Sequence, residues 1–472
     1  MKASKRSLLT AFAASALAST AGAATITVGP SLTDFDYITI TAAISAAVDG
    51  DVIEIAPGLY PENLSISSKD LTLRNAGGGT VTVFGQDLGK CLVITGGSTD
   101  AFVEGITFTR GFSTTAGAGV SIEGGARADI TDCIIENSMN TGVGGGLYMS
   151  GGGTITRTII RDNQAVGNGG GIYLIGSLQK NFIDCTIENN TGVEGGGLAY
   201  DASGDIIDII GCTFKDNTAT NRGGAITVLG GSSSAGVVEA ENCRFLSNRA
   251  DTAGGAVWVS DRDIFRAFNT IFIENSAGDD GGAIRNEQIV DLINCTMVNN
   301  EVDTEGRGDT FSTIRSDANT ILLNCIVVNE SADSHFSIGD YLPTYSLLPE
   351  APSGTPDSNG NFNADPMFTD ALMNDYTLAA GSPAIDAGNS RGGHGGINVL
   401  DIMTDLNDDV RNLDDQDTPN TGISTWELCV DLGAYEYQPS NAPACQADLN
   451  DDGILDFFDI SAFLTIFSSG CP

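Results

Sequence analysis

Six residues near the C-terminal end of the chain have the types and spacing of the ligands in a twelve-residue calcium-binding loop. Oxygen-bearing side chains occupy loop positions 1, 3, 5, 9 and 12, and Gly453 at position 6 allows the sharp turn that such a loop needs. A backbone carbonyl at position 7 completes the set, so the sequence predicts one calcium ion as a cofactor. The predicted ligands are Asp448, Asn450, Asp452, Ile454 (through its carbonyl), Asp456 and Asp459.

An apolar helix face and two cysteines accompany this loop. The apolar residues recur at the spacing of one face of an exiting helix. Cys445 and Cys471 flank loop and helix, and in an exported chain we expect a disulfide between them. The apolar positions are Ile460, Phe463, Leu464 and Phe467.

Residues 445–472 resemble a dockerin segment of the short kind that cysteines bracket. Like dockerin loops, this one ends in Asp at position 12. The resemblance implies a cohesin-like partner, but ordinary dockerins carry two loops, so a generic cell-surface anchoring or sorting tag is an equal alternative. The nearest second loop begins at Asp405, but it has Val410 in place of glycine and Leu413 at position 9. We interpret it as a loop of the preceding domain.

A second set of residues has types that glycoside hydrolysis uses. The tripeptide of Gly393, His394 and Gly395 resembles a motif of polygalacturonases, and Asp279 and Asp280 resemble their paired acids. More than a hundred residues separate the two parts, and the acids precede a Gly-Gly-Ala corner where solvated acids are ordinary. We therefore do not expect a polygalacturonase site.

Polysaccharide lyases suggest a third combination, in which acids hold calcium and an Arg or Lys removes the sugar α-proton. Several acids lie near two arginines in the first third of the chain, but no lyase motif joins them. A solvated face of mixed charge is the favoured interpretation. The residues concerned are Asp100, Glu123, Asp129, Asp132, Arg110 and Arg127.

One short sequence motif repeats at steps of 25 to 31 residues, and the fold that it specifies must position all of these groups. Its first column is apolar or small, its second column five residues later is polar, and a glycine-rich corner follows. Such a period marks a stacked solenoid, and short β-branched units indicate strands. The first column is Ile106, Cys133, Thr158, Cys185, Cys212, Cys243, Thr270, Cys295 and Cys325; the second is Ser138, Asn163, Asn190, Asn217, Asn248, Asn275 and Asn300.

We predict an all-β fold, a right-handed parallel β-helix, with the calcium-binding tail as its short α-helical appendage. Identical residue types return at one point of each turn because turns stack at the strand spacing of about 4.8 Å. Stacked asparagines can then hydrogen-bond from turn to turn at a tight bend, and small Cys or Thr suits a narrow interior.

The repeats resemble those of polymorphic outer membrane proteins, which pair F-x-x-N with G-G-A-I, as residues 214–217 and 223–226 do here. More broadly, the chain resembles secreted bacterial β-helix proteins of the pectin-lyase-like superfamily. Its segment 40–66 resembles their N-terminal region, with a short amphipathic helix that caps the first turn at about 36–50. Segments 364–390 and 430–438 resemble their irregular closing region, here about 340–440. The β-helix domain is thus predicted over 24–440.

The first 23 residues have the features of a signal peptide. Lys2, Lys5 and Arg6 precede an apolar run over residues 8–17, and Ala21 and Ala23 form a cleavage site of the A-x-A kind. That run is too short to span a bilayer, and no later segment could do so. We expect a secreted or cell-surface protein without a transmembrane segment.

The charge of the chain limits its partners. A formal net charge of −39 argues against nucleic acid and against unassisted binding of anionic polymers. Eight cysteines lie outside the tail. We expect the six in the repeats to be buried, reduced thiols, while Cys91 and Cys429 have no evident partners. The absence of C-x-x-C and the presence of only two histidines disfavour a Cys-rich zinc site.

Two functions fit these features. The favoured one is a non-catalytic, surface- or matrix-associated β-helix that presents a long face for adhesion or carbohydrate contact and is tethered through its calcium tail. The alternative is a polysaccharide lyase or glycoside hydrolase with an accessory tail. No complete catalytic motif decides whether the chain is an enzyme. The deciding feature is whether carboxylates and a base converge along the coil.

The calcium loop yields a direct prediction. The tail is too short to build a sizeable core, so metal and disulfide should order it together. Calorimetry on the disulfide-intact segment 445–472 should show uptake of one calcium ion, and the controls Asp448→Ala and Asp459→Ala should lose it. No uptake at millimolar calcium would contradict the dockerin-like interpretation.

Overall fold

The computed structural model describes residues 23–201, 204–230, 235–303, 313–328, 336–337, 341–353, 356–395, 397–424 and 429–438. The predicted signal peptide, apart from its last residue, and the predicted calcium-binding tail over 445–472 lie outside the described residues. The predicted calcium ligands Asp448 to Asp459 and the predicted Cys445–Cys471 disulfide therefore stay predictions.

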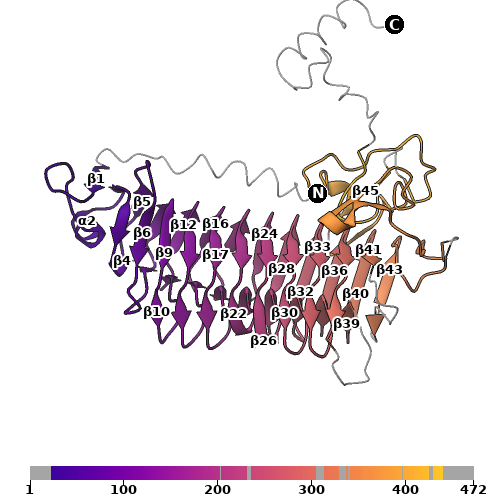
Figure 1. Ribbon diagram of the computed structural model, residues 1–472, viewed down its shortest axis with the longest axis horizontal. Coiled ribbons are helices and arrows are strands. Elements are labelled where there is room, and N and C mark those ends of the chain that lie inside the picture. The colour runs from indigo at the N-terminus through magenta and orange to yellow at the C-terminus, as the bar shows by residue number, and fades with distance from the viewer. Residues whose placement is uncertain are drawn as a thin grey trace, which may run out of the picture.

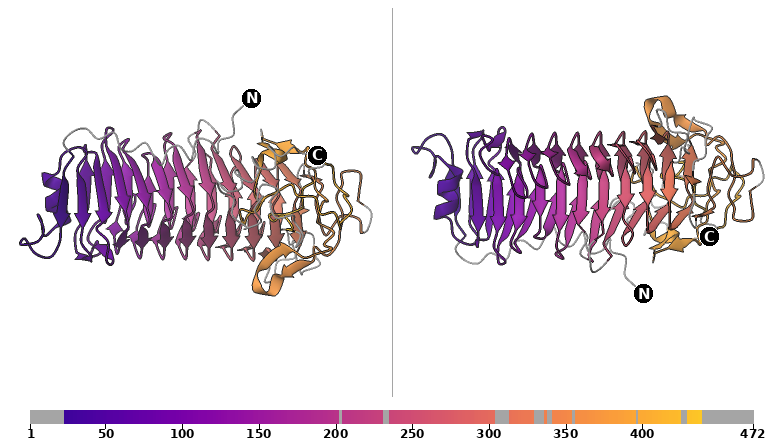
Figure 2. Two further views of the ribbon diagram at one scale, coloured as in Figure 1. Left: turned by 90° about the horizontal axis from the view of Figure 1, so that it is seen from above. Right: turned by 90° about the horizontal axis from the view of Figure 1, so that it is seen from below.

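The chain coils into a long rod of parallel strands, so the predicted parallel β-helix is confirmed (Figure 1). Each full turn contributes one strand to each of four sheets, called A, B, C and D here, in the chain order A, B, D, C. Figure 2 shows the strands of successive turns lying side by side along the whole rod. Side chains that point inward from these sheets form one continuous apolar core.

Sheet A is the longest, with 13 strands among the described residues. Buried and partly exposed residues alternate along most of its strands, as expected when one face meets the core. Its strands are β1 (Thr25–Val28), β2 (Val52–Ile55), β5 (Leu71–Asn75), β8 (Asp100–Glu104), β12 (Arg127–Thr131), β16 (Gly153–Thr156), β20 (Lys180–Ile183), β24 (Ile206–Ile210), β28 (Val237–Glu241), β32 (Ile264–Phe268), β36 (Ile289–Ile293), β40 (Asn319–Leu323) and β43 (Tyr341–Thr344).

Sheet B follows sheet A in each turn and has 11 described strands. Phe214, Phe245 and Phe272 stack inside it, with ring centroids 5.2 and 4.8 Å apart. The aromatic repeat of the sequence is therefore an interior stack. The strands are β3 (Gly58–Tyr60), β6 (Val81–Phe84), β9 (Ile106–Thr109), β13 (Ile134–Glu136), β17 (Ile159–Arg161), β21 (Thr186–Glu188), β25 (Thr213–Lys215), β29 (Arg244–Leu246), β33 (Ile271–Ile273), β37 (Thr296–Val298) and β41 (Ile326–Val328).

Sheet D is short and lies between the polar bend and the glycine corner, with eight strands in the described part of the chain. The corner glycines must be glycine, because a Cβ at Gly196 would lie 2.6 Å from the carbonyl oxygen of Gly224 in the next turn. The strands are β10 (Phe112–Ser113), β14 (Met139–Asn140), β18 (Gln164–Ala165), β22 (Thr191–Glu194), β26 (Thr218–Arg222), β30 (Arg249–Ala250), β34 (Ser276–Ala277) and β38 (Glu301–Val302).

Sheet C closes each turn and has 11 described strands. Three consecutive residues are buried in several of them, so part of its outer face is covered as well as its inner face. The strands are β4 (Leu64–Ser67), β7 (Leu92–Thr95), β11 (Val120–Glu123), β15 (Leu147–Met149), β19 (Ile172–Ile175), β23 (Leu198–Asp201), β27 (Ile226–Leu229), β31 (Val257–Val259), β35 (Ile284–Asn286), β39 (Ile314–Ser316) and β42 (Phe336–Ser337).

The predicted asparagine column forms a buried ladder at the bend between sheets B and D. Asn190 shows the repeated pattern: its backbone N–H donates to Asn217 Oδ1 at 3.1 Å, and its Nδ2 donates to the same oxygen at 3.0 Å and to Ile160 O at 2.8 Å. The bend residue before it, Asn189, has φ +54°, a conformation that Asn and Asp tolerate better than most residues. The ladder runs through Asn163, Asn190, Asn217, Asn248, Asn275 and Asn300.

The cysteine column lies in the interior at the bend between sheets A and B, as predicted, and it also hydrogen-bonds. The backbone N–H of Cys185 donates to Cys212 Sγ at 3.3 Å, and that of Cys243 donates to Thr270 Oγ1 at 3.2 Å. A thiol sulfur and a hydroxyl oxygen thus accept the same hydrogen bond, which explains why both Cys and Thr occur in this column. Burial raises the pKa of Cys243 to about 12, so the thiol stays protonated.

A second asparagine row, which was not predicted from the sequence, lies on the outside of the same bend. Asn269 Nδ2 donates to Asn242 Oδ1 at 3.2 Å, and Asn324 Nδ2 donates to Asn294 Oδ1 at 3.1 Å. Asn269 Nδ2 also donates to the backbone oxygen of Thr404 at 2.6 Å. This row therefore connects the coil to the closing region.

The helix α2 (Ile40–Ala46) covers the N-terminal end of the coil (Figure 1). It buries Ile40, Ala43 and Ile44, so the predicted short amphipathic helix at this end is confirmed. Charged side chains pair with the backbone groups at both ends of this helix. Glu62 accepts from the N–H groups of residues 40 and 41 at its N-terminus. Lys69 Nζ donates to the carbonyls of residues 44, 45 and 47 at its C-terminus.

The closing region is irregular and packs against the sides of the last turns. Its apolar residues Val399, Ile402 and Val430 cover the outer face of sheet A, and Leu406 and Tyr435 cover that of sheet B. Figure 2 shows this region surrounding the C-terminal end of the rod. Its short elements are β44 (Phe368–Asp370), η1 (Ala371–Met373), β45 (Asp375–Leu378), β46 (Gly393–His394), β47 (Ile397–Asn398) and η2 (Val399–Asp401).

Replacing a ladder asparagine should test what holds the turns together. Asn217→Val removes the side chain's hydrogen bonds and leaves the backbone N–H of Asn190 and the carbonyl of Ile187 unpaired, so it should lower the free energy of unfolding by about 1–3 kcal/mol. The control Thr220→Val changes an exposed residue of the same turn and should have little effect. Equal stability of the two variants in denaturant titrations would contradict the role of the ladder.

Candidate functional site

Polar side chains form one continuous row along the outer face of sheet A. Register places each member directly beside the next, and the inward neighbours of the row, such as Ile209 and Ala240, are fully buried. Adjacent members are therefore separated by the strand spacing of about 4.8 Å. We call this set the sheet A row: Asp129, Thr154, Asn181, Asp208, Glu239, Arg266 and Asp291.

The row ends in a cluster of charges under the closing region. Arg266 Nη1 lies 3.0 Å from Glu239 Oε1, and its Nε donates to Asp291 Oδ2 at 3.1 Å. His394, on β46, places Nδ1 2.9 Å from Asp291 Oδ1. The Asp291 side chain is 1% exposed, whereas that of His394 is 45% exposed. We call Glu239, Arg266, Asp291 and His394 the charge cluster.

Glycine next to the histidine makes this contact possible. Gly395 has φ +63°, and a Cβ there would lie 2.8 Å from Arg266 Nε and 2.9 Å from Asp291 Oδ2. Only glycine lets the β46–β47 hairpin approach the cluster so closely. Packing against the charge cluster therefore requires the glycine that follows His394, whether or not the histidine has a chemical role.

The charge cluster places the His394 imidazole beside a buried carboxylate. An imidazole nitrogen can donate or accept a hydrogen bond, depending on which nitrogen carries the proton. Arg266 is shared between two carboxylates, so it offers little free positive charge to a ligand. The arrangement suits contact with neutral hydroxyl groups better than capture of an anion.

The two parts of the polygalacturonase-like set are not brought together. His394 lies against sheet A, whereas Asp280 Oδ2 lies 3.8 Å from Arg285 Nε at the corner between sheets D and C. The structure thus agrees with the sequence argument against that site.

The lyase-like acids and arginines are also dispersed. Asp132 pairs with Arg157 at 2.8 Å, and Arg110 pairs with Asp87. Glu123 lies 3.5 Å from Lys90 on sheet C. Of the predicted set, Asp100, Arg127 and Asp129 are neighbours on sheet A, where burial raises the pKa of Asp100. Apart from these three neighbours on sheet A, the set therefore forms separate surface pairs.

The repeat tyrosines do not form an open platform for sugar rings. The rings of Tyr148 and Tyr173 stack with centroids 6.1 Å apart, but Tyr173 is 9% exposed and its hydroxyl donates to Asp201 Oδ2 at 3.1 Å. Tyr200 points into the core. Trp258, in the same outer column of sheet C, is 5% exposed beneath the guanidinium of Arg222. Sheet C is therefore a less suitable contact surface than sheet A.

The closing region contains its own buried charges. The guanidinium of Arg411 lies 3.4 Å from Glu436 Oε2 and donates to Gly433 O at 2.8 Å. Glu436 also accepts from the backbone N–H groups of Asn412 and Leu413. Burial raises the pKa of Glu436 to about 7, although Arg411 opposes this shift. These bonds fix the loops of a region with few strands.

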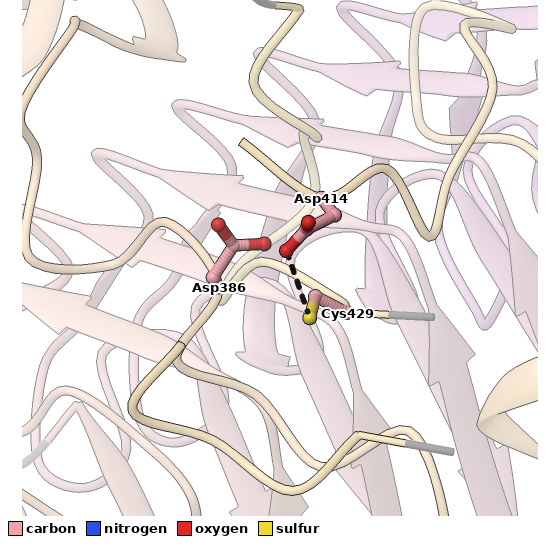
Figure 3. Close-up of side chains that lie close together, drawn as sticks. All are labelled: Asp386, Asp414 and Cys429. Carbon is pink, nitrogen blue, oxygen red and sulfur yellow. Dashed lines mark hydrogen bonds between the residues drawn. The ribbon is translucent and has the colours of Figure 1, made fainter. Parts of the chain in front are cut away.

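A group of potential metal ligands lies next to the Arg411–Glu436 pair. Asp386, Asp414 and Cys429 each direct one ligand atom toward the others, and these atoms lie within 4.8 Å of one another (Figure 3). Cys429 Sγ lies 3.5 Å from Asp414 Oδ1. Burial raises the pKa of Asp386 to about 7 and that of Cys429 to about 12. No partner for Cys429 could be predicted from the sequence, because Asp386 and Asp414 lie in other loops and share no motif with it.

The other predicted sites lie beyond what the structure describes. Neither the calcium loop nor its flanking cysteines Cys445 and Cys471 fall within the described residues. Among the residues that are described, no helix is long and apolar enough to cross a membrane.

Comparisons with known proteins match the coil. The model of the right-handed beta helix region matches residues 90–276, and the model of the Chlamydia polymorphic membrane protein repeat matches residues 269–287. These matches agree with the resemblances drawn from the repeats. No curated protein matches the sequence.

Solved structures similar to this chain include three polysaccharide-modifying enzymes. Pectate lyase Pel9A is 14% identical with a TM-score of 0.46, covering 88% of this chain and 98% of its own. A pectin methylesterase from Aspergillus niger is 15% identical (TM-score 0.33; 72% and 93% covered), and an alginate lyase from Paenibacillus sp. is 14% identical (TM-score 0.32; 69% and 99% covered). At these values the likenesses carry no argument about activity.

The charge cluster yields a stability prediction. Asp291→Asn leaves Arg266 without one of its two carboxylates in a nearly buried place, so it should cost about 2–4 kcal/mol in the free energy of unfolding. The control Asp251→Asn breaks an exposed pair with Arg249 and should cost less than about 1 kcal/mol. Similar denaturant midpoints for the two variants would show that the cluster does not secure the closing region.

Proposed function

We propose that this chain is a non-catalytic β-helix protein that contacts neutral glycans through the sheet A row. The observation that supports this is the row itself, in which amide, hydroxyl and carboxylate side chains stand on adjacent turns of one outer face. A surface of regularly repeated hydrogen-bonding groups suits a polymer of regularly repeated hydroxyl groups.

The chemistry of the row favours sugar hydroxyls as ligands. Carboxylate oxygens accept from hydroxyl groups, and hydrogen bonds with one charged partner are the stronger kind. Asn181 adds both donors and acceptors, and Thr154 adds a hydroxyl. All three types remain partly exposed along β16, β20 and β24, so a ligand can reach them.

The charge of the row disfavours acidic glycans. Asp208 and Glu239 are adjacent, and the arginine beside them is already paired with two carboxylates. The chain as a whole carries a formal charge of −39. Uronate polymers would be repelled both locally and at long range unless a cation intervened.

The closing region sets one end of the contact surface. Beyond Arg266, the outer face of sheet A is covered by Val399, Ile402 and Val430. The open part of the row therefore runs from Asp129 to Glu239, and a chain lying on it would meet the half-exposed His394 at that end.

Export and tethering belong to the same proposal. A signal peptide over 1–23 would deliver the chain to the outside, and the calcium-binding segment 445–472 would attach it to a cohesin-like or other cell-surface partner. The rod would then present the sheet A row to a matrix polysaccharide, which is an adhesive role.

Polysaccharide cleavage at the charge cluster is the second candidate. It is favoured by one observation: the buried Asp291 carboxylate lies beside a half-exposed imidazole, an arrangement that could position a general base. Asp208 and Glu239 on adjacent strands would supply the carboxylates that such cleavage needs. Release of shortened or unsaturated products separates this candidate from the first.

Binding and product release can be measured together on a panel of neutral and acidic polysaccharides, with and without calcium. We expect retention by a neutral glycan without products. The double variant Asn181→Ala, Asp208→Ala should weaken binding about tenfold or more, because each lost hydrogen bond contributes about 1 kcal/mol.

The matched control removes two hydroxyls from the outer face of sheet B in the same turns. Thr186→Ala, Thr213→Ala should leave binding within about twofold of the unchanged protein. Binding that is lost equally in both double variants, or no binding to any neutral glycan, would contradict the proposed surface. Product release would establish the second candidate instead.

A further inference from the structure

We infer that Asp386, Asp414 and Cys429 bind a divalent zinc-like cation that holds together three loops of the closing region. The three ligand atoms lie within 4.8 Å of one another, a separation that a single ion between them can bridge after small adjustments (Figure 3). This site is separate from the predicted calcium loop of the tail.

The Asp386 carboxylate provides an independent reason to expect a ligand. The residue is 1% exposed, and its Oδ1 is buried without a hydrogen-bond partner in the described part of the protein. Its other oxygen accepts from the backbone N–H of Asp415 at 3.1 Å. Figure 3 shows the carboxylate turned toward Asp414 and Cys429. A buried carboxylate oxygen without a partner is costly, and a cation would remove that cost.

The backbone around Asp386 holds it firmly in place. Its own N–H donates to Asp431 Oδ1 at 2.7 Å, and its carbonyl accepts from the N–H groups of Thr421 and Gly422 at 3.1 and 3.0 Å. Its φ of +53° is a left-handed conformation that these contacts maintain. A ligand fixed in this way contributes a preformed part of a site.

The mixture of ligand atoms selects the kind of metal. A thiolate with two carboxylates fits zinc, which accepts both sulfur and oxygen at about 2.0–2.3 Å and prefers four ligands. Calcium and magnesium bind oxygen ligands and do not favour a thiolate ligand. Asp414 is exposed, so water can reach the fourth position.

The position of the ligands indicates a structural role. They come from three separate stretches of irregular chain, and Val430, next to Cys429, packs against Ile293 and Leu323 of the last turns. An ion bound here would add a cross-link to the backbone hydrogen bonds that join two of these stretches, such as that from the N–H of Gly388 to the carbonyl of Val430 at 2.9 Å. With a single cysteine, this site differs from the Cys-rich zinc site that the sequence disfavours.

Cobalt(II) titration of the full chain tests the inference, because a thiolate ligand gives cobalt a charge-transfer band in the near ultraviolet. We expect such a band at one equivalent of cobalt, its loss on adding zinc, and its persistence in excess calcium. Cys429→Ser should abolish the band. The matched control Cys91→Ser, which changes another buried cysteine outside the repeats, should retain it.

Asp386→Asn keeps the shape of the side chain and removes its charge, so it should weaken cobalt binding about tenfold or more. Circular dichroism of each variant distinguishes loss of the site from loss of the fold, and the unchanged chain provides the zinc-competition result whatever the variants do. The absence of a thiolate band in the folded, unchanged protein, or an undiminished band in Cys429→Ser, would overturn the proposal.

Discussion

Hydrogen bonds between buried side chains and the backbone of the adjacent turn are the constraint on which the rest of this structure depends. Every turn of a parallel coil must bend sharply, and each bend leaves backbone groups that no strand can satisfy. The asparagine column satisfies them at the bend between sheets B and D, and the Cys/Thr column does so between sheets A and B. Because each side chain bonds to the next turn, register is fixed along the whole rod.

Because the register is fixed, residues that are far apart in the sequence become neighbours on one surface of the coil. Asn181, Asp208 and Glu239 are separated along the chain by a full repeat each, yet they become direct neighbours on sheet A. The same stacking produces the outer asparagine row at residues 242, 269, 294 and 324, on which the closing region docks. Surface recognition and attachment of the closing region thus both follow from the coil.

The sequence predicted the coil well because its signals are local and repeated. The asparagine and cysteine columns, the glycine corners and the helix at residues 40–46 each satisfy a requirement of one bend or one end. The outer asparagine row was missed because the same position is Gly, Asp or Arg in the earlier turns and becomes Asn only from residue 242 onward. Cys and Thr were interpreted as space-filling, whereas the structure shows that they also hydrogen-bond.

Contacts of the closing region could not be predicted in the same way. His394 meets Asp291, and Cys429 meets Asp414 and Asp386, through loops that have no period and no motif. Only the three-dimensional path of those loops brings the groups together.

Native-state hydrogen exchange at the backbone amides of Asn190, Asn217 and Asn248 tests most directly whether the bend ladder holds the coil. Each of these amides donates to the side-chain oxygen of the next asparagine inside the protein. If the ladder secures the turns, these amides exchange only when the coil unfolds globally, and they are among the slowest in the molecule. Exchange as fast as that of the exposed bend at residues 78–79 would contradict this account.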